Sequence, residues 1–175
     1  MRKGHCMYFL YCSVSCFEII KFIIEFVLTF FTVFISVVAL YTTNRFNRQS
    51  VRPIAEIHIC DYEDDVSVSL RNVGTGPLTI KSFVCTNGQI KSESLVKVVN
   101  LSHDVAYTTF EEELLGRTLP PNESIVLIRL NSNEITGIQQ LRKELGNISI
   151  QLEYEDIYEK TFAVTKNLTY FKRHE

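Results

Sequence analysis

The distribution of apolar residues divides the chain into two parts of different character. Cys6 to Thr43 contains no glycine and no proline and consists mostly of Phe, Ile, Val and Leu. Its second half, extended by one residue to Phe26–Asn44, is an uncharged run long enough to cross a bilayer, which takes about 20 residues of helix. Beyond this run, apolar and polar residues alternate over short stretches, the pattern of half-buried strands. The pattern therefore predicts a membrane helix followed by one soluble, β-rich domain.

The apolar run is interpreted as a retained single span. A signal peptide has a shorter apolar region that ends in small residues at a cleavage site, whereas this run is longer and ends Ala-Leu-Tyr-Thr-Thr. The helix of a soluble core would show a polar face, whereas Phe26 to Tyr41 has only Thr and Ser as polar residues. We place the span at about residues 23–43 within a tail and membrane helix of 1–44. A basic linker, 45–52, and a soluble domain, 53–175, follow.

One face of the predicted membrane helix carries ionisable and hydroxyl side chains. The members of this polar stripe are Glu18, Lys21, Glu25, Thr29, Thr32 and Ser36. Small and hydroxyl residues let membrane helices approach closely, and an ionisable group near a span usually faces a partner or water. Pairing of Glu18 and Glu25 with Lys21 inside the same helix is the plainer explanation. The stripe favours self-association, and a water-lined path is the remaining alternative.

Charge and cysteine content restrict the partners and the cellular compartment that we expect for the domain. Beyond Asn44 the chain has 15 Lys and Arg against 18 Asp and Glu, which argues against a nucleic-acid partner, because such a partner requires a basic face. The one basic cluster, predicted to meet lipid headgroups, is Arg45, Arg48 and Arg52. Positive charges on the two sides of the span are equal in number, so they leave its orientation open. Cys60 and Cys85 are expected to be free thiols rather than a bridge, which favours a cytosolic domain.

The soluble part predicts a mainly β fold: an antiparallel β-sandwich of immunoglobulin-like type with one short helix. Ile54–Cys60 and Val66–Arg71 alternate as a hairpin, and the acidic residues 61–65 between them are expected to form a solvated turn. Ser94–Leu101 is expected to be a further strand. Asn133–Gly146 has apolar residues at helical spacing, with Asn133 as the expected cap.

Catalytic and metal-binding patterns are not found in the sequence. The histidines His5, His58, His103 and His174 show no metal-ligand spacing, and no nucleophile elbow, zinc-protease motif or phosphate loop occurs. His58 is expected to point to solvent, since it alternates with the apolar positions of its strand. We therefore expect no cofactor, no metal and no enzymatic activity.

Three stretches carry a resemblance. SLRNVGTGPLTIKSF, LPPNESIVLIRL and ISIQLEYEDIYEKTF, in this order behind a single span and an Arg-Pro, resemble small uncharacterised bacterial membrane proteins that carry a soluble sandwich domain. The resemblance covers about residues 51–164 and implies a fold and an anchor, with no catalytic residues. It also implies a glycine after the Ile-Tyr pair, where this chain has Glu159.

Two functions follow from this architecture. The first is a membrane-anchored, non-enzymatic interaction or assembly module, a homo-oligomer whose sandwich binds a protein partner. The alternative is a ligand- or partner-gated effector that disrupts the membrane in bacterial antiviral defence. Both place the chain in a membrane as a single-pass protein, with the bacterial inner membrane and a cytosolic domain as the expected location.

Overall fold

The computed structural model describes residues 4–100, 107–132 and 135–174, with side chains from residue 17 to residue 173. It separates into two compact units, Met1–Asn47 and Arg48–Glu175. Each is described by itself.

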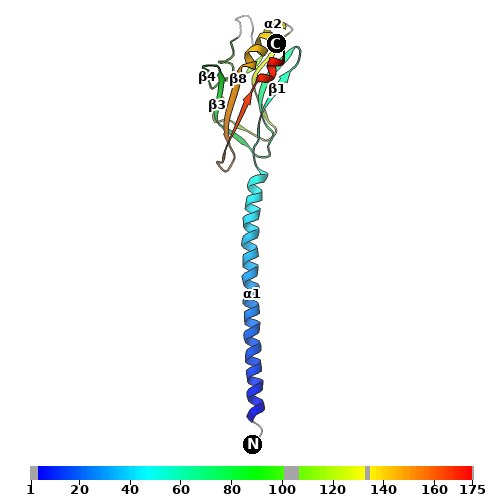
Figure 1. The fold of residues 1–175 in the computed structure, drawn as a ribbon, viewed down its shortest axis with the longest axis vertical. Coiled ribbons are helices and arrows are strands. Elements are labelled where there is room, and N and C mark those ends of the chain that lie inside the picture. The colour runs from blue at the N-terminus through cyan, green and yellow to red at the C-terminus, as the bar shows by residue number, and fades with distance from the viewer. Residues whose placement is uncertain (1–3, 101–106, 133–134, 175) are drawn as a thin grey trace. The chain divides into compact units, whose positions relative to one another are not determined.

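The first unit consists mainly of α1, an unbroken helix from Gly4 to Ser50 whose last three residues belong to the second unit (Figure 1). Of the described residues, one helical segment is long and apolar enough to cross a membrane by length and composition, Phe17–Ser50, with a mean hydropathy of 2.5 in its most apolar window. None of this window is buried within the chain. A helix that is apolar on all sides requires an apolar environment, and here the chain itself does not provide one. The helix also continues through most of residues 45–52, for which we expect a linker.

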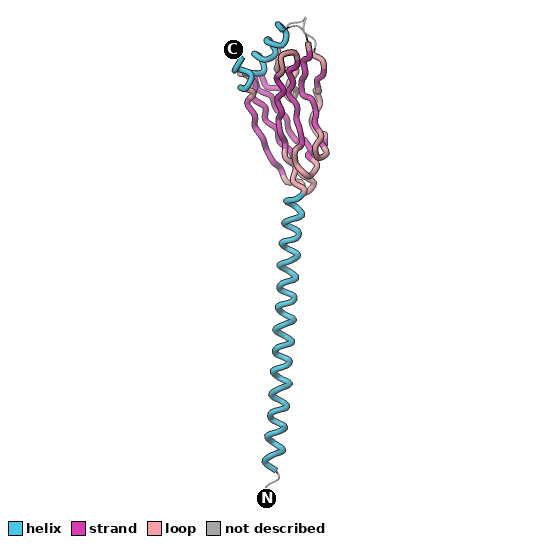
Figure 2. The backbone as a smooth tube through the Cα atoms, turned by 90° about the vertical axis from the view of Figure 1, so that its right-hand side faces the viewer, coloured by secondary structure: helices cyan, strands magenta, loops and turns pink. Residues whose placement is uncertain are grey.

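The second unit is an antiparallel β-sandwich, as the sequence predicts (Figure 2). One sheet has the strand order β1-β2-β7-β5, and the other has β4-β3-β8-β9 with β6 paired to β3. The strands are β1 Ala55–Asp61, β2 Asp65–Asn72, β3 Leu78–Asn87, β4 Ile90–Ser92, β5 Thr109–Phe110, β6 Thr118–Leu119, β7 Ser124–Asn131, β8 Ile148–Glu155 and β9 Thr161–Asn167. The helices are α2, Ile135–Gly146, and the 3-10 helix η1, Thr169–His174.

The strand order corresponds to the two sheets of an immunoglobulin constant-type domain with two strands, β4 and β6, added beside β3 in the second sheet. The other hallmarks of that family, a core tryptophan and an inter-sheet disulfide, are missing, because the chain has no Trp and Cys60 and Cys85 are free. The closer immunoglobulin-like assignment therefore stays a prediction.

The core lies between the two sheets and follows the period-2 pattern of the strands. In β1, Ala55 and Ile57 are buried while His58 is exposed, as expected. β2 contributes Val66, Val68 and Leu70, each with an exposed fraction of 0%. The paired strand β7 and the second sheet supply the facing side chains: Leu127, Ile128, Leu130, Ile80, Phe83, Ile150 and Leu152. This apolar layer provides most of the driving force for folding of the domain.

Two segments differ from the sequence-based expectation. Ser94–Val99 forms turns rather than the predicted strand, with the backbone N–H groups of Val98 and Val99 both donating to Leu95 O at 3.2 Å. Leu95, Val98 and Val99 are buried, and spacings of three and four residues bring side chains together in a helical turn. Leu101 and the expected cap Asn133 lie outside the described residues. The C-terminal η1, which buries Phe171, was not predicted.

The chain enters the domain through a tight crossing of two loops. A Cβ added at Gly74 would collide with the backbone nitrogen of Ile54, and one added at Gly76 would collide with the carbonyl oxygen of Val51. Thr75, between these glycines, donates hydrogen bonds from its backbone N–H to Arg52 O and from its hydroxyl to Ser50 O. The Gly-Thr-Gly motif is therefore needed for close backbone approach, which only glycine permits.

Candidate functional site

The six residues of the predicted polar stripe fall on one side of α1. With 100° between successive residues, its six members fall within an arc of about 80°. They are Glu18, Lys21, Glu25, Thr29, Thr32 and Ser36, all exposed within the chain. Val27 and Phe34 lie on the opposite side of the helix, which is aromatic and aliphatic.

The hydroxyl groups of the stripe donate to the backbone of their own helix. Thr29 Oγ1 donates to Glu25 O at 2.7 Å, and Thr32 Oγ1 donates to Leu28 O at 2.8 Å. Ser36 Oγ donates to Thr32 O at 2.8 Å. Each hydroxyl proton is thus satisfied without a second helix, while the hydroxyl oxygens remain able to accept. Close packing, rather than donated hydrogen bonds, is what this face offers to a neighbouring helix.

The arginines of the predicted basic cluster are exposed, and two of them lie on aromatic rings of the domain. The Arg48 guanidinium lies 5.2 Å from the centre of the Tyr158 ring. The Arg52 guanidinium lies 4.8 Å from the centre of the Phe162 ring, and Lys160 Nζ lies 5.4 Å from the same centre. We call Arg48, Arg52, Tyr158, Lys160 and Phe162 the aromatic–basic cluster. The sequence indicated its arginines but not the rings, which follow more than a hundred residues later.

The aromatic–basic cluster is held by a well-formed turn between β8 and β9. Asp156 Oδ1 accepts hydrogen bonds from the backbone N–H groups of Tyr158 at 2.8 Å and of Lys160 at 3.0 Å. Glu159 has a φ of 61°, the left-handed conformation that favours glycine. This is the position at which the resemblance implied a glycine. The geometry leaves Ile157 and Tyr158 at the tip, 54% and 44% exposed.

Phe162 connects the aromatic–basic cluster to the core. Its ring stacks on Tyr154, with centroids 5.5 Å apart and an interplanar angle of 24°. The Tyr154 hydroxyl accepts a hydrogen bond of 3.4 Å from the backbone N–H of Ala55, the first residue of β1. The cluster is thus built on residues of both sheets, which restricts its freedom to move.

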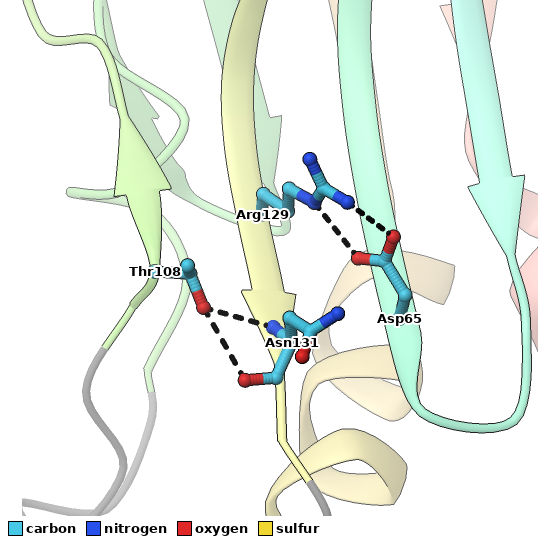
Figure 3. Close-up of polar contacts among 4 residues, drawn as sticks. All are labelled: Asp65, Thr108, Arg129 and Asn131. Carbon is cyan, nitrogen blue, oxygen red and sulfur yellow. Dashed lines mark hydrogen bonds and ion pairs between the residues drawn. The ribbon is translucent and has the colours of Figure 1, made fainter.

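Both ends of the acidic run 61–65 have structural partners, in contrast to the solvated turn that the sequence predicts. Figure 3 shows Arg129 of β7 bound to Asp65 of β2 through two hydrogen bonds of 3.0 and 2.7 Å. These bonds and the charge of Asp65 raise the pKa of Arg129. In the same view Thr108 Oγ1 accepts from Asn131 N at 2.9 Å. These hydrogen bonds join neighbouring strands, and the carboxylate of Asp65 is paired with Arg129.

Asp61, at the other end of the acidic run, is 1% exposed at its side chain and binds two arginines. Arg142 Nε of α2 donates to it at 2.8 Å, and an Arg173 guanidinium nitrogen of η1 donates at 3.3 Å. Arg142 also donates to Tyr62 O at 2.6 Å. These contacts fix α2 and η1 against the β1–β2 turn, so the role of Asp61 is structural.

The described residues contain few arrangements capable of chemistry. No group of three His, Cys, Asp or Glu side chains among them is placed to hold a metal ion. Burial raises the pKa of Cys85 to about 12, so its thiol is protonated and unreactive at neutral pH. A shallow hollow of about 560 Å³ beside β1 and β9 is lined mainly by Ile54, Ala55, Ile57, Val73 and Val164. Glu56 and Lys166 complete the lining, so the hollow offers a mostly apolar contact surface with two charged residues.

The structure therefore defines a mainly β protein: an antiparallel sandwich preceded by one helix of membrane-spanning length and composition. No protein-family model and no curated protein matches the chain. Among solved structures, it is similar to a chain from the archaeal flagellum of Methanospirillum hungatei strain JF1, with 10% identity, 90% of both chains covered and a TM-score of 0.36. It is also similar to the archaellum periplasmic stator protein FlaG from Sulfolobus acidocaldarius, with 12% identity, 66% of this chain and 100% of that chain covered, and a TM-score of 0.26.

TM-scores this low support no conclusion about function. The resemblance to bacterial proteins with an immunoglobulin-like domain receives no support from these comparisons. The structure supports the more general description, a β-sandwich preceded by one apolar helix.

Proposed function

We propose that this protein is a membrane-anchored, non-enzymatic assembly module that self-associates through the polar stripe of α1. The proposal rests chiefly on one observation. Every described side chain of the apolar helix is exposed within the chain, and its polar residues gather on one face. In a bilayer, a face of small and hydroxyl residues gains most from packing against another helix. Arg45, Arg48 and Arg52 would then lie among the lipid headgroups just beyond the span.

The domain supplies surface for a protein partner. β1 and β9 are edge strands of their respective sheets, and the apolar hollow lies beside both. Unpaired strand edges are templates for a further strand. We place the domain on the cytosolic side, because Cys60 and Cys85 are free thiols and free thiols persist in a reducing compartment.

Energy transfer between copies of the full chain in liposomes tests the self-association. Two fluorescent-protein fusions report proximity of the chains. The double variant Thr32→Leu with Ser36→Leu removes the hydroxyls and enlarges the stripe, so transfer should fall. The matched control, Val27→Leu with Phe34→Leu, makes two leucine replacements on the opposite side of the helix and should leave transfer unchanged. Equal transfer in both double variants would refute association through the stripe.

The gated-effector alternative stays a prediction, and a growth assay distinguishes it from the assembly module. It requires expression of the chain to be toxic to cells. It also requires the triple variant Glu25→Leu, Thr32→Leu, Ser36→Leu to lose toxicity while keeping its oligomer. A chain that is not toxic on overexpression excludes this alternative.

A further inference from the structure

Ile157 and Tyr158 form an apolar tip that the fold holds in place without covering. Asp156 fixes the turn through two hydrogen bonds, yet more than two fifths of each tip side chain is exposed. We propose that the β8–β9 turn is a second membrane contact, in which Ile157 and Tyr158 enter the headgroup layer of an anionic bilayer while the aromatic–basic cluster binds lipid phosphates. This inference rests on the proposed membrane anchoring and adds to it a contact made by the domain.

Chain length places the turn within reach of the bilayer. Arg48 follows Thr43, the last residue of the expected span, by five residues, which extend at most about 18 Å. Along a helix, the conformation that α1 keeps through Ser50, the same residues rise about 7.5 Å. The headgroup region adds about 6 Å to each side of the hydrocarbon core. Since Arg48 lies 5.2 Å from the Tyr158 ring, the turn lies close to this layer.

The chemistry of the turn fits an interface between lipid and water. Tyrosine is enriched at the headgroup level, where its ring is in apolar surroundings and its hydroxyl is solvated. A guanidinium that stacks on a ring keeps its N–H groups free along its edge, so Arg48 and Arg52 can bind phosphate oxygens while they remain on their rings. Burial of Ile157 adds an apolar contribution to the contact.

The charge of this region favours anionic lipid by a small margin. Three cations, Arg48, Arg52 and Lys160, face two carboxylates of the turn, Asp156 and Glu159. Asp156 keeps its negative charge while it accepts from backbone N–H groups, and Glu159 is an exposed carboxylate, so both oppose binding. Basic residues near an anionic surface attract it, and three cations against two carboxylates leave a net charge of +1, so the carboxylates reduce the attraction without reversing it.

A tryptophan probe tests the contact in the full chain. The chain has no tryptophan, so Tyr158→Trp introduces a single fluorophore that keeps an aromatic ring beneath Arg48. The control is Tyr62→Trp in the β1–β2 turn, where Tyr62 is 66% exposed. The seven residues of β1 separate that turn from Ala55, a distance of about 23 Å. Both variants are reconstituted in liposomes containing phosphatidylglycerol, with and without bromine-labelled acyl chains that quench tryptophan.

The expected result is a blue-shifted emission, quenched by bromolipid, for Tyr158→Trp, and an unshifted, unquenched emission for Tyr62→Trp. Adding Arg48→Gln and Arg52→Gln to Tyr158→Trp should reduce the quenching, whereas Arg71→Gln, which removes an exposed arginine of β2, should not. If Tyr158→Trp is as weakly quenched as Tyr62→Trp, the proposal is overturned. A blue shift without quenching that grows with protein density points instead to a second copy of the chain, and also overturns it.

Failure of this inference is distinguishable from failure of the anchoring. Extraction of the same liposomes with alkaline carbonate leaves integral proteins in the membrane pellet. A pelleted chain with an unquenched tryptophan in Tyr158→Trp refutes the second contact alone. A chain released into the supernatant refutes the membrane anchoring itself, and the second contact with it.

Discussion

Asn72 is a buried polar residue that connects the segment entering the domain with the Gly-Thr-Gly loop, and its replacement should destabilise the fold strongly. The residue has an exposed fraction of 0%. Its Nδ2 donates to Gly76 O at 2.8 Å and to Leu119 O at 3.0 Å. Its Oδ1 accepts from the backbone N–H groups of Gly74 at 3.0 Å and of Ile54 at 3.3 Å. One side chain thus connects the start of the domain, the Gly-Thr-Gly loop and β6.

The magnitude follows from these four bonds. A hydrogen bond contributes about 1 kcal/mol net, and a buried group left without a partner costs about 1–3 kcal/mol. Asn72→Ala should therefore lower the free energy of unfolding by about 3–5 kcal/mol, against a total of about 5–15 kcal/mol for a typical domain. Asn131→Ala is the control. Asn131 is exposed, and its hydrogen bonds with Thr108 use its own backbone atoms, so Asn131→Ala should change the free energy of unfolding by no more than about 0.5 kcal/mol.

Asn72→Asp separates hydrogen bonding from packing. The carboxylate keeps the size of the amide and its acceptor oxygen, but it replaces the Nδ2 donor with a second oxygen that faces the Gly76 and Leu119 carbonyl oxygens. Burial beside these oxygens raises the pKa of the new carboxyl above its ordinary value of about 3.9. The folded state then binds more protons than the unfolded state, so the deficit relative to wild type should grow as the pH rises above about 4.

Urea unfolding in detergent micelles, followed by thiol labelling, measures these losses. Cys85 is buried in the core, so in a background with the other four cysteines replaced by serine its labelling reports unfolding of the domain and ignores α1. A loss below about 1 kcal/mol for Asn72→Ala, or a deficit for Asn72→Asp that does not change with pH, would contradict this reasoning.

Three further predictions follow from the same unit. Glu159→Gly should raise the free energy of unfolding by about 1 kcal/mol in urea titrations, because the φ of 61° strains any residue with a Cβ. Gly76→Ala should abolish folding or cost several kcal/mol, since the new methyl group collides with the carbonyl oxygen of Val51; the soluble yield and thiol labelling measure it. Above pH 9 the free energy of unfolding should fall by up to about 1.4 kcal/mol per pH unit, because the thiol of Cys85 ionises at lower pH in the unfolded chain than in the folded one. The fall should continue until the pH reaches the raised Cys85 pKa of about 12. The slope should be smaller in a Cys85→Ala variant.

Each of these has a contrary outcome. A Glu159→Gly variant that unfolds at lower urea concentration would show that the glutamate contributes contacts worth more than the strain. A Gly76→Ala variant with wild-type stability would mean that Val51 is not held against the loop. An alkaline slope as steep in Cys85→Ala as in the wild type would contradict the third prediction. A smaller slope should remain in the variant, because burial and the charge of Glu144 also raise the pKa of Tyr107.

The alternation of apolar residues was sufficient to predict the fold class and the β1–β2 hairpin, since strand burial is a local property with a period of two. The same rule was wrong at Ser94–Val99, where the apolar spacing is that of a helical turn. The helix was also predicted, because an uncharged apolar run has few alternatives.

The arrangement of the candidate site was predictable only in part. The polar stripe lies on one helix and is visible from spacing alone. The aromatic–basic cluster pairs Arg48 and Arg52 with rings in β9 and its turn, and the pairing of distant strands is not encoded in local pattern. Asp61 and Asp65 were expected in solvent, since nothing in a run of acidic residues indicates which of them meets an arginine from another element.

The crossing of Val51–Ile54 with the Gly-Thr-Gly loop has a mechanical consequence. A pull applied through α1 would reach the backbone at Val51 before it reached the first hydrogen bonds of β1. There it would act on the close backbone packing of Val51 and Ile54 against Gly76 and Gly74, and on the hydrogen bond from Thr75 N to Arg52 O. The force would then be distributed over the loop that Asn72 connects to both sheets. It would not act first on the hydrogen bonds between β1 and β2. The entry of the chain into the domain is thus braced by close backbone packing against the Gly-Thr-Gly loop.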